Sequence, residues 1–171
     1  MGLESGTVRV VGYDPKWPAL FSKESERLRQ ACRALPISLE HVGSTAVPGL
    51  CAKPVLDVLA GHPAEIPPLE YVAAFARAGY EHRGDAGIPH HQFFRRGQPR
   101  AYHIHLVEHG GLLWLQYLGF RDLLRRDAHR ARQYADLKET LAARFPQDRE
   151  AYIRGKAAFV EEILSEVRGA A

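Results

Sequence analysis

The sequence predicts an α/β or α+β domain, with a small mixed β-sheet, helices packed on one face of it and a C-terminal helical tail. Two patterns predict this class. Short apolar stretches bounded by glycine and proline recur between residues 37 and 107, as is typical of strands. Apolar residues recur at helical spacing near the N-terminus and through the last third of the chain. We expect one domain, 1–171, because a chain of this length can bury a sufficient core.

The first half of the chain is predicted to hold, in order, strand 7–11, helix 15–35, strand 37–42, strand 55–60 and helix 67–78. Asp14 before Pro15 is typical of a helix start, because the carboxylate accepts from free amides and proline fits the first helical position. Pro36 ends that helix. The loop between strands 37–42 and 55–60 is short and rich in turn-forming residues, so we expect it to be rigid.

The second half is predicted to hold a hairpin and three helices: strand 91–96, strand 101–107 and helices 112–124, 131–145 and 148–167. Gly97 to Pro99 supplies the turn of the hairpin. Each helical segment repeats apolar residues with a period of 3.6, and Pro146 separates the last two. These three helices form the predicted tail.

The composition excludes several classes of function. No apolar run approaches the roughly 20 residues of a membrane span, so no membrane partner is expected. The N-terminus lacks the features of a signal peptide, which predicts a cytoplasmic protein. Cys32 and Cys51 form no C-x-x-C pair, so a thiolate zinc site is not indicated. The formal charge is only +3 and no long basic run is present, which disfavours a nucleic-acid partner.

Asp57 is the first candidate for a functional residue. In a strand it shares one face with Val55 and Leu59, and the other face is also apolar. An unpaired carboxylate in such surroundings costs several kcal/mol, so Asp57 needs a cation or strong hydrogen-bond donors. A divalent metal ion meets that need, and a structural salt bridge to Lys53 is the alternative.

Gly43, Ser44 and Thr45 directly follow the preceding strand. Backbone amides and two hydroxyls can converge on a phosphate at such a turn, and glycine permits close approach. The alternative is an ordinary tight turn in which Ser44 bonds to local amides. The position of the turn, one strand before Asp57, favours a phosphate-binding role.

His103 and His105 are two residues apart on a predicted strand, so both side chains leave the same face. They are candidates to bind one metal ion or to flank one phosphate, with His41 or Asp57 as a further ligand, since catalytic zinc sites normally use three protein ligands. Packed, hydrogen-bonded histidines are the alternative. His90 and His91 are predicted to lie at a loop edge without a functional role.

These motifs together resemble the GrpB family, whose members are similar to the nucleotidyltransferase superfamily. The resemblance extends over almost the whole chain and rests chiefly on residues 10–21, 41–50, 52–57, 103–105 and 120–125. It implies a nucleotidyltransferase-like fold. It also implies that Gly43 and Ser44 hold a triphosphate, that Asp57 binds a divalent metal ion, and that Lys53 and Arg100 are further phosphate contacts.

The chain departs from the superfamily pattern at one carboxylate. A D-x-D pair would place a second acid at Leu59, and His103 or His105 lies where a third acid is expected. Two Mg²⁺ ions prefer several oxygen ligands, whereas one carboxylate with imidazoles suits Zn²⁺, Mn²⁺ or a single ion. The resemblance assigns Asp57, His103 and His105 as catalytic residues, with an imidazole acting in proton abstraction or charge stabilisation.

Three functions remain open from the sequence. The first is an enzyme that transfers a nucleoside monophosphate from an NTP to an acceptor with the help of Mg²⁺, Mn²⁺ or Zn²⁺. The second is a nucleotide-binding or CoA-pathway accessory module without transfer chemistry, which Leu59 favours. The third is a metal-dependent phosphohydrolase. All three imply a nucleotide or another phosphorylated small molecule as partner.

Overall fold

A computed structural model describes residues 1–4 and 6–169. Five strands form one sheet in the order β1-β2-β5-β4-β3, in which β2 and β5 are parallel and the other neighbours antiparallel. The strands are β1 (Ser38–Val42), β2 (Leu56–His62), β3 (Glu81–His82), β4 (Gln92–Arg96) and β5 (Tyr102–Glu108). The helices are α1 (Trp17–Ala31), α2 (Glu70–Arg77), α3 (Leu112–Arg126), α4 (Ala128–Arg144) and α5 (Arg149–Gly169). The predicted mixed sheet is confirmed.

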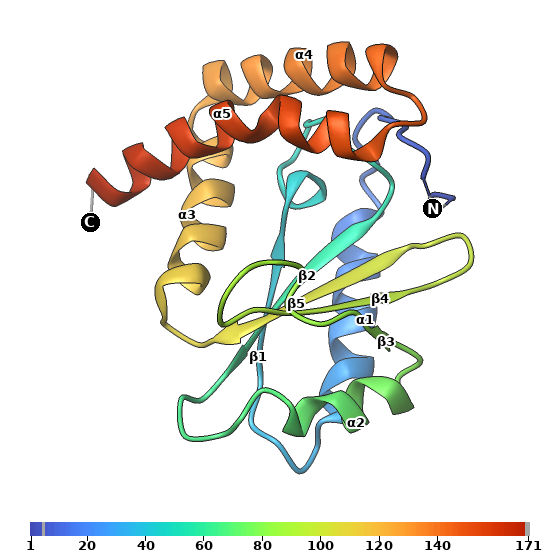
Figure 1. Ribbon diagram of the computed structural model, residues 1–171, viewed down its shortest axis with the longest axis vertical. Coiled ribbons are helices and arrows are strands. Elements are labelled where there is room, and N and C mark those ends of the chain that lie inside the picture. The colour runs from blue at the N-terminus through green and yellow to red at the C-terminus, as the bar shows by residue number, and fades with distance from the viewer. Residues whose placement is uncertain (5, 170–171) are drawn as a thin grey trace.

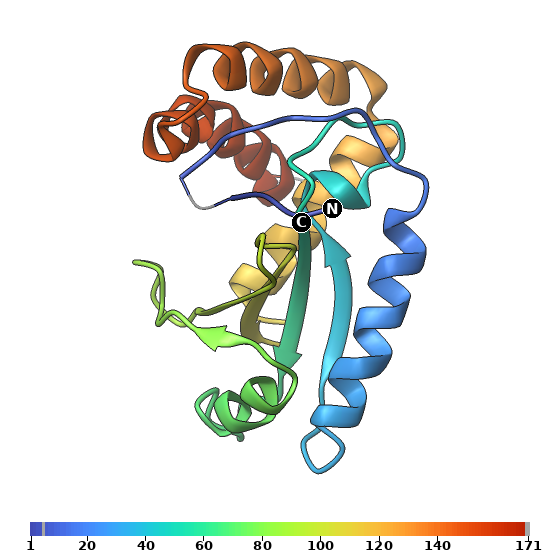
Figure 2. The same cartoon turned by 90° about the vertical axis from the view of Figure 1, so that its right-hand side faces the viewer.

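Helices α1 and α2 cover one face of the sheet (Figures 1 and 2). The alternate apolar residues of β2 and β5, such as Val58 and Ile104, are fully buried there against Leu28 of α1 and Phe75 of α2. This side of the sheet forms the largest part of the core, as the period of two in the strands requires.

The opposite face is covered by α3 at one end only. Trp114 of α3 packs on Leu59 and Val107, and a Cβ at Gly61 would lie 2.7 Å from its ring. The first helix of the predicted tail, α3, thus returns along this second face, while α1 and α2 occupy the first face as expected. The end of this face that carries Asp57 is left to α4 and α5, which lie across the end of the sheet (Figure 1).

Two short segments differ from the predicted strands. Residues 7–11 form no strand, because their partners lie apart: Val8 N donates to Pro146 O at 2.8 Å, whereas Val11 forms an isolated bridge with Ala52. The two-residue strand β3 follows α2 and pairs with β4. It was not predicted because two residues are too few to show the alternation of a strand.

The helix ends also differ slightly from the prediction. Asp14 accepts a hydrogen bond from Lys16 N at 2.9 Å and so holds a turn, and α1 begins at Trp17 rather than at the expected proline.

In the residues that the structure describes, no helix combines the length and hydropathy needed to cross a bilayer.

Candidate metal and phosphate site

Asp57 and the histidines at 103 and 105 lie on the sheet face turned away from α1. The parallel pairing of β2 with β5 places Asp57 level with His103, and Leu59 level with His105. Because paired residues of neighbouring strands point to the same side, the three polar side chains converge. The predicted sharing of a face by His103 and His105 is thus confirmed, and Asp57 lies beside them.

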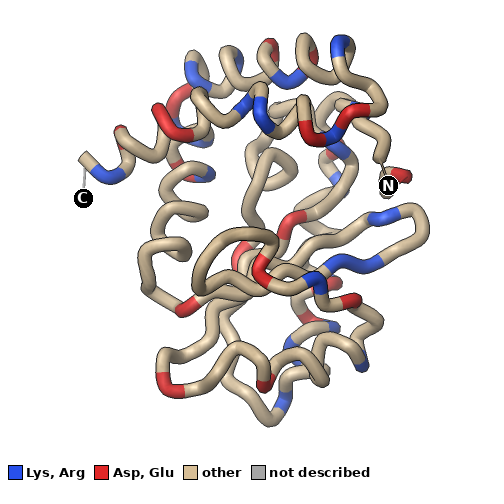
Figure 3. Tube along the Cα trace, viewed as in Figure 1, with Lys and Arg blue, Asp and Glu red and all other residues tan. Residues whose placement is uncertain are grey.

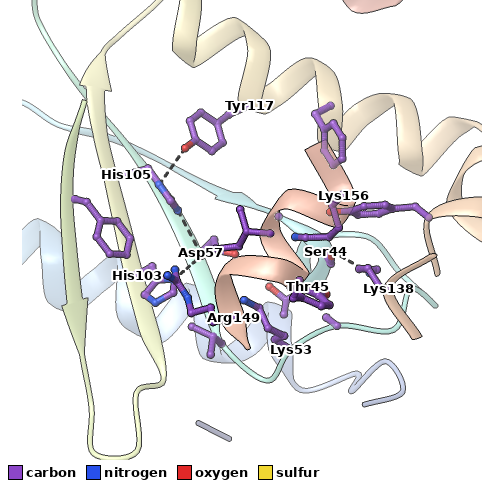
Figure 4. A pocket seen from close by; sticks show the side chains of 18 residues that line it. Ser44, Thr45, Lys53, Asp57, His103, His105, Tyr117, Lys138, Arg149 and Lys156 are labelled. Atoms are coloured by element: carbon purple, nitrogen blue, oxygen red, sulfur yellow. Dashed lines mark hydrogen bonds and ion pairs between the residues drawn. The ribbon is translucent and has the colours of Figure 1, made fainter. Parts of the chain in front are cut away.

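The three side chains share a single carboxylate oxygen. Oδ1 of Asp57 lies 2.9 Å from Nδ1 of His103 and 3.4 Å from Nε2 of His105 (Figure 4). Burial raises the pKa of Asp57, but the two imidazoles outweigh it and hold that pKa well below its usual value. Asp57 is therefore ionised at neutral pH.

This group fits a divalent ion. One ligand atom from each of Asp57, His103 and His105 can be chosen so that all lie within 4.8 Å of one another. Zinc bonds of about 2.0–2.1 Å place two ligands of a tetrahedron roughly 3.3 Å apart, close to the 2.9 and 3.4 Å that separate Oδ1 of Asp57 from the two histidine nitrogens. Two nitrogens and one oxygen are also a donor set that suits Zn²⁺ or Mn²⁺ better than two Mg²⁺ ions.

The turn that follows β1 lies directly against the carboxylate. Gly43 has a φ of 71°, and a Cβ at this position would lie 2.6 Å from Oδ2 of Asp57. Only glycine allows both the backbone conformation and this approach. Residues Ser44–Ala46 then form a single 3-10 turn.

The two hydroxyls of the turn have different partners. Ser44 Oγ accepts a hydrogen bond from Lys138 Nζ at 3.0 Å, which ties the turn to α4. Thr45 Oγ1 lies 2.9 Å from Nε2 of His41, and Thr45 is only 2% exposed. The hydroxyl of Ser44 is thus hydrogen-bonded to a cation, whereas that of Thr45 is hydrogen-bonded to His41 of β1.

His41 does not join the cluster, which corrects its expected role as a metal ligand. It is paired with Val58 in the sheet, so its side chain points to the face opposite Asp57. Its ring stacks on Phe21 of α1 at 4.8 Å between centroids. Burial lowers the pKa of His41 to about 4, so the ring is neutral.

Beside the cluster is a cavity of about 280 Å³ with a strongly basic wall. Four cationic side chains line it: Lys53, Lys138, Arg149 and Lys156. Among the described residues that line it, Asp57 is the one carboxylate. Figure 4 shows these side chains around the turn that carries Ser44. The cavity therefore combines a candidate metal site with an excess of positive charge.

Two of these lysines are held in an unusual state. Burial lowers the pKa of Lys53 to about 8 and that of Lys138 to about 7. Lys138 is 2% exposed, and its ammonium also lies 4.6 Å from the ring centroid of Tyr134. An anion in the cavity would favour the charged form of both lysines, because it supplies the counter-charge that burial removes.

Arg100 lies in the loop that joins β4 to β5, outside the lining of this cavity. It borders a second hollow with Arg95, Arg96 and Pro99. Its positive charge still lowers the pKa of both Lys53 and His103, although burial is the larger cause for each. The structure thus brings Lys53 into the cavity and Arg100 only to its neighbourhood.

Sequence reasoning missed the basic residues of the helical tail, although a signal was present. Lys138 follows Tyr134 by four residues and precedes Leu141 by three, so it lies on a buried stripe of α4. Lys156 has the same relation to Tyr152 and Phe159 in α5. A lysine on an apolar helical stripe requires a counter-charge or a hydrogen-bond partner, which was the available clue.

His91 was also missed. It is 1% exposed, and its Nε2 lies 3.0 Å from Nδ1 of His105. The Tyr117 hydroxyl lies at the same distance from that nitrogen. His91 and Tyr117 therefore both contact His105 of the cluster at the same nitrogen.

Basic and acidic residues are both spread along α4 and α5 (Figure 3). Arg130 is paired with Glu162 at 2.8 Å and also with Glu166. Arg121 is paired with Glu40 and Asp122, each at 2.7 Å. These ion pairs neutralise positive charge that a nucleic acid would otherwise contact.

A family model described as GrpB protein matches residues 7–166. The chain is 41% identical over 162 residues to a UPF0157 protein of Pseudomonas aeruginosa, covering 92% of this chain and 66% of that protein. It is 35% identical over 159 residues to UPF0157 protein YqkA of Bacillus subtilis, covering 90% and 45%. The chain thus spans two thirds or less of these two relatives.

A third relative has a named activity. The dephospho-CoA kinase of Mycolicibacterium paratuberculosis is 30% identical over 179 residues, which cover 87% of this chain and 43% of that protein.

Two solved structures resemble the fold. The crystal structure of conserved protein GrpB from Enterococcus faecalis has a TM-score of 0.84 at 32% identity, covering 93% of this chain and 96% of that one. The Cid1 poly(U) polymerase with MgGTP bound has a TM-score of 0.52 at 14% identity, covering 78% and 44%. The second likeness shows a nucleotidyltransferase-like fold and nothing further.

Proposed function

The chain belongs to the GrpB family, and from that premise we propose that it binds a nucleoside triphosphate with a divalent metal ion and transfers the nucleoside monophosphate to an acceptor. One observation carries the proposal. A single cavity joins the Asp57, His103 and His105 cluster to four cationic side chains, with no second carboxylate among the described lining residues. Such a cavity is suited to a polyphosphate and its counter-cation.

The residues take distinct roles in this proposal. Asp57 and His105 would hold the ion, which would neutralise charge on the phosphate oxygens, while His103 would donate its Nδ1 hydrogen to Asp57 and keep a lone pair on Nε2. The turn at Gly43 and Ser44, with Lys53 and Lys138, would bind the phosphates.

Transfer requires the acceptor oxygen to attack the α-phosphorus while pyrophosphate leaves with the electron pair of the broken P–O bond. The proton of an acceptor hydroxyl must then go to a base. Nε2 of His103 is a candidate, since it is buried and has no hydrogen-bond partner in the described part of the chain. Burial lowers the pKa of His103, so its ring is neutral and able to accept a proton.

Leu59 supports a second candidate function, nucleotide binding without transfer. This residue is fully buried where a second metal-binding carboxylate would stand. His105, level with Leu59 on the next strand, reaches the carboxylate of Asp57 instead.

The test is incubation of the protein with an NTP labelled at the α-phosphate, Mg²⁺, Mn²⁺ or Zn²⁺, and a small-molecule extract. Transfer predicts label on an acceptor and release of pyrophosphate, and Asp57→Asn should abolish both. Label that binds without reacting would support the second function. Release of labelled nucleotide with no acceptor product would indicate a phosphohydrolase.

A further inference from the structure

His91 occupies a buried position next to His105 of the Asp57, His103 and His105 cluster, immediately before β4. Its Nδ1 lies 3.0 Å from the backbone oxygen of Asp85, and its Nε2 lies 3.0 Å from Nδ1 of His105. The ring also packs beside that of Phe93, with 6.3 Å between centroids. Both nitrogens of His91 thus have one partner each, which makes the direction of the hydrogen bonds decidable.

The direction follows from the carbonyl group. A backbone oxygen only accepts, so Nδ1 of His91 must carry the hydrogen and donate it to Asp85. His91 is buried, and among the described residues its two nitrogens face a carbonyl oxygen and a second imidazole rather than a carboxylate, so the ring is neutral. A neutral imidazole has one N–H, and Nε2 of His91 is therefore a lone-pair acceptor.

The same logic passes to His105. Its Nδ1 faces the acceptor on His91 at 3.0 Å, so this nitrogen carries a hydrogen and donates it. The Tyr117 hydroxyl, also 3.0 Å from Nδ1, can donate or accept and does not select the tautomer. In a neutral His105, Nε2 then directs a lone pair at Oδ1 of Asp57 across 3.4 Å. Two lone pairs at this separation need a cation between them, which either a proton on Nε2 or a metal ion would supply.

We propose that His91 is a positioning residue that fixes His105 as the Nδ1–H tautomer and so presents Nε2 of His105 as a metal ligand. The inference rests on the metal ion of the proposed function. It adds which atom binds and what holds that atom in place. A ligating histidine usually donates its other N–H to a carbonyl, carboxylate or water. Here a second histidine, itself anchored on Asp85, takes that place.

His103 has no such support. Its Nδ1 faces Asp57, and its Nε2 has no hydrogen-bond partner in the part of the chain that the structure describes. Because an ionised carboxylate only accepts, Nδ1 of His103 carries the hydrogen and donates it to Asp57, which leaves a lone pair on Nε2. The contrast assigns His105 as the fixed imidazole of the cluster and leaves His103 free to exchange protons with a bound molecule.

The test is a calorimetric titration of the intact protein with Zn²⁺ and with Mn²⁺, without nucleotide. His91→Phe keeps an aromatic ring but has no acceptor, and it should weaken metal binding about 10–100-fold, the usual effect of losing such a partner. His91→Gln offers an amide oxygen to Nδ1 of His105 and should recover part of the loss. His62→Phe, the same change at a buried histidine at the far end of β2, is the matched control and should change the affinity less than threefold.

A second measurement reports the tautomer itself. Imidazole ¹⁵N NMR of the zinc-loaded wild-type protein should show His105 protonated at Nδ1 and unprotonated at Nε2. Protonation at Nε2, or equal metal affinity in wild type and His91→Phe, would overturn the inference even if the metal binds. Absence of metal binding to the wild type would instead contradict the proposed function, so the two failures are distinguishable.

Discussion

At the scale of single residues, Lys138 is the buried cation whose charged form depends most on a bound anion. Burial lowers its pKa to about 7, and the nearest described partner with negative character is a backbone oxygen, that of Cys51. A protonated lysine binds an anion, and raising the pH through 7 deprotonates the empty site. Anion affinity should therefore fall as the pH rises, while the bound anion keeps the ammonium charged.

We predict that sulfate, whose own charge is constant over this range, binds the wild-type protein about twentyfold more weakly at pH 8 than at pH 6, and that Lys138 accounts for about tenfold of this. In Lys138→Met only the smaller change from Lys53, whose pKa is about 8, should remain, about twofold. Calorimetric titration at both values measures the difference. Parallel pH profiles for the two proteins would show that Lys138 does not face the anion.

The residues of the cluster could be found from the sequence because a polar residue is conspicuous in the apolar pattern of a buried strand. Asp57 between aliphatic neighbours, and His103 with His105 at a spacing of two, are visible without coordinates. The basic wall was not visible in this way, since it depends on how α4 and α5 fold back over the sheet. His41 was misplaced for a related reason: the alternation fixes relative faces within one strand, but not which face of β1 matches that of β2.

At the scale of elements, close packing of α5 on α3 holds the basic wall in position. Gly119 of α3 faces Val167 of α5, and a Cβ added there would overlap both methyl groups of the valine. Because Arg149 and Lys156 belong to α5, the distance between these helices sets the position of two of the four cations.

We predict that Gly119→Ala lowers the free energy of unfolding by about 1–3 kcal/mol through overpacking. Helix propensity alone would predict a gain of up to about 1 kcal/mol, so the sign is informative. Denaturant unfolding measures it, and sulfate affinity should fall in the same variant. Leu115→Ala, at a position of α3 that is 56% exposed, is the control expected to change little. A more stable Gly119→Ala protein would refute the packing argument.

Periodicity predicted the long elements well and the short contacts poorly. The hairpin β4–β5 and the three tail helices were found within a few residues of their ends, because each has a full period of apolar residues. Residues 7–11 have the composition of a strand but no continuous neighbour, since one end meets the helical tail and the other meets Ala52. Pairing partners are a property of the fold and are absent from a local pattern.

At the scale of the whole molecule, the sheet and the helical tail contribute different halves of one site. The sheet supplies the acid and the imidazoles on its open face, and α4 and α5 bring lysines and an arginine across the end of that face (Figure 1). Neither half by itself would provide a site for both a phosphate and a metal ion. The sequence indicated the first half and the fold class, and only the packing of the tail revealed the second.

The most direct test of the account is the coupling between metal ion and nucleotide. Affinity for a non-hydrolysable NTP analogue should be measured by calorimetry with and without Mn²⁺, in the wild type and in Asp57→Asn. We expect Mn²⁺ to raise the affinity of the wild type at least about tenfold, a coupling of about 1.4 kcal/mol, and to have no effect on the variant. Equal affinities with and without Mn²⁺ in the wild type would contradict a shared site for the ion and the phosphates.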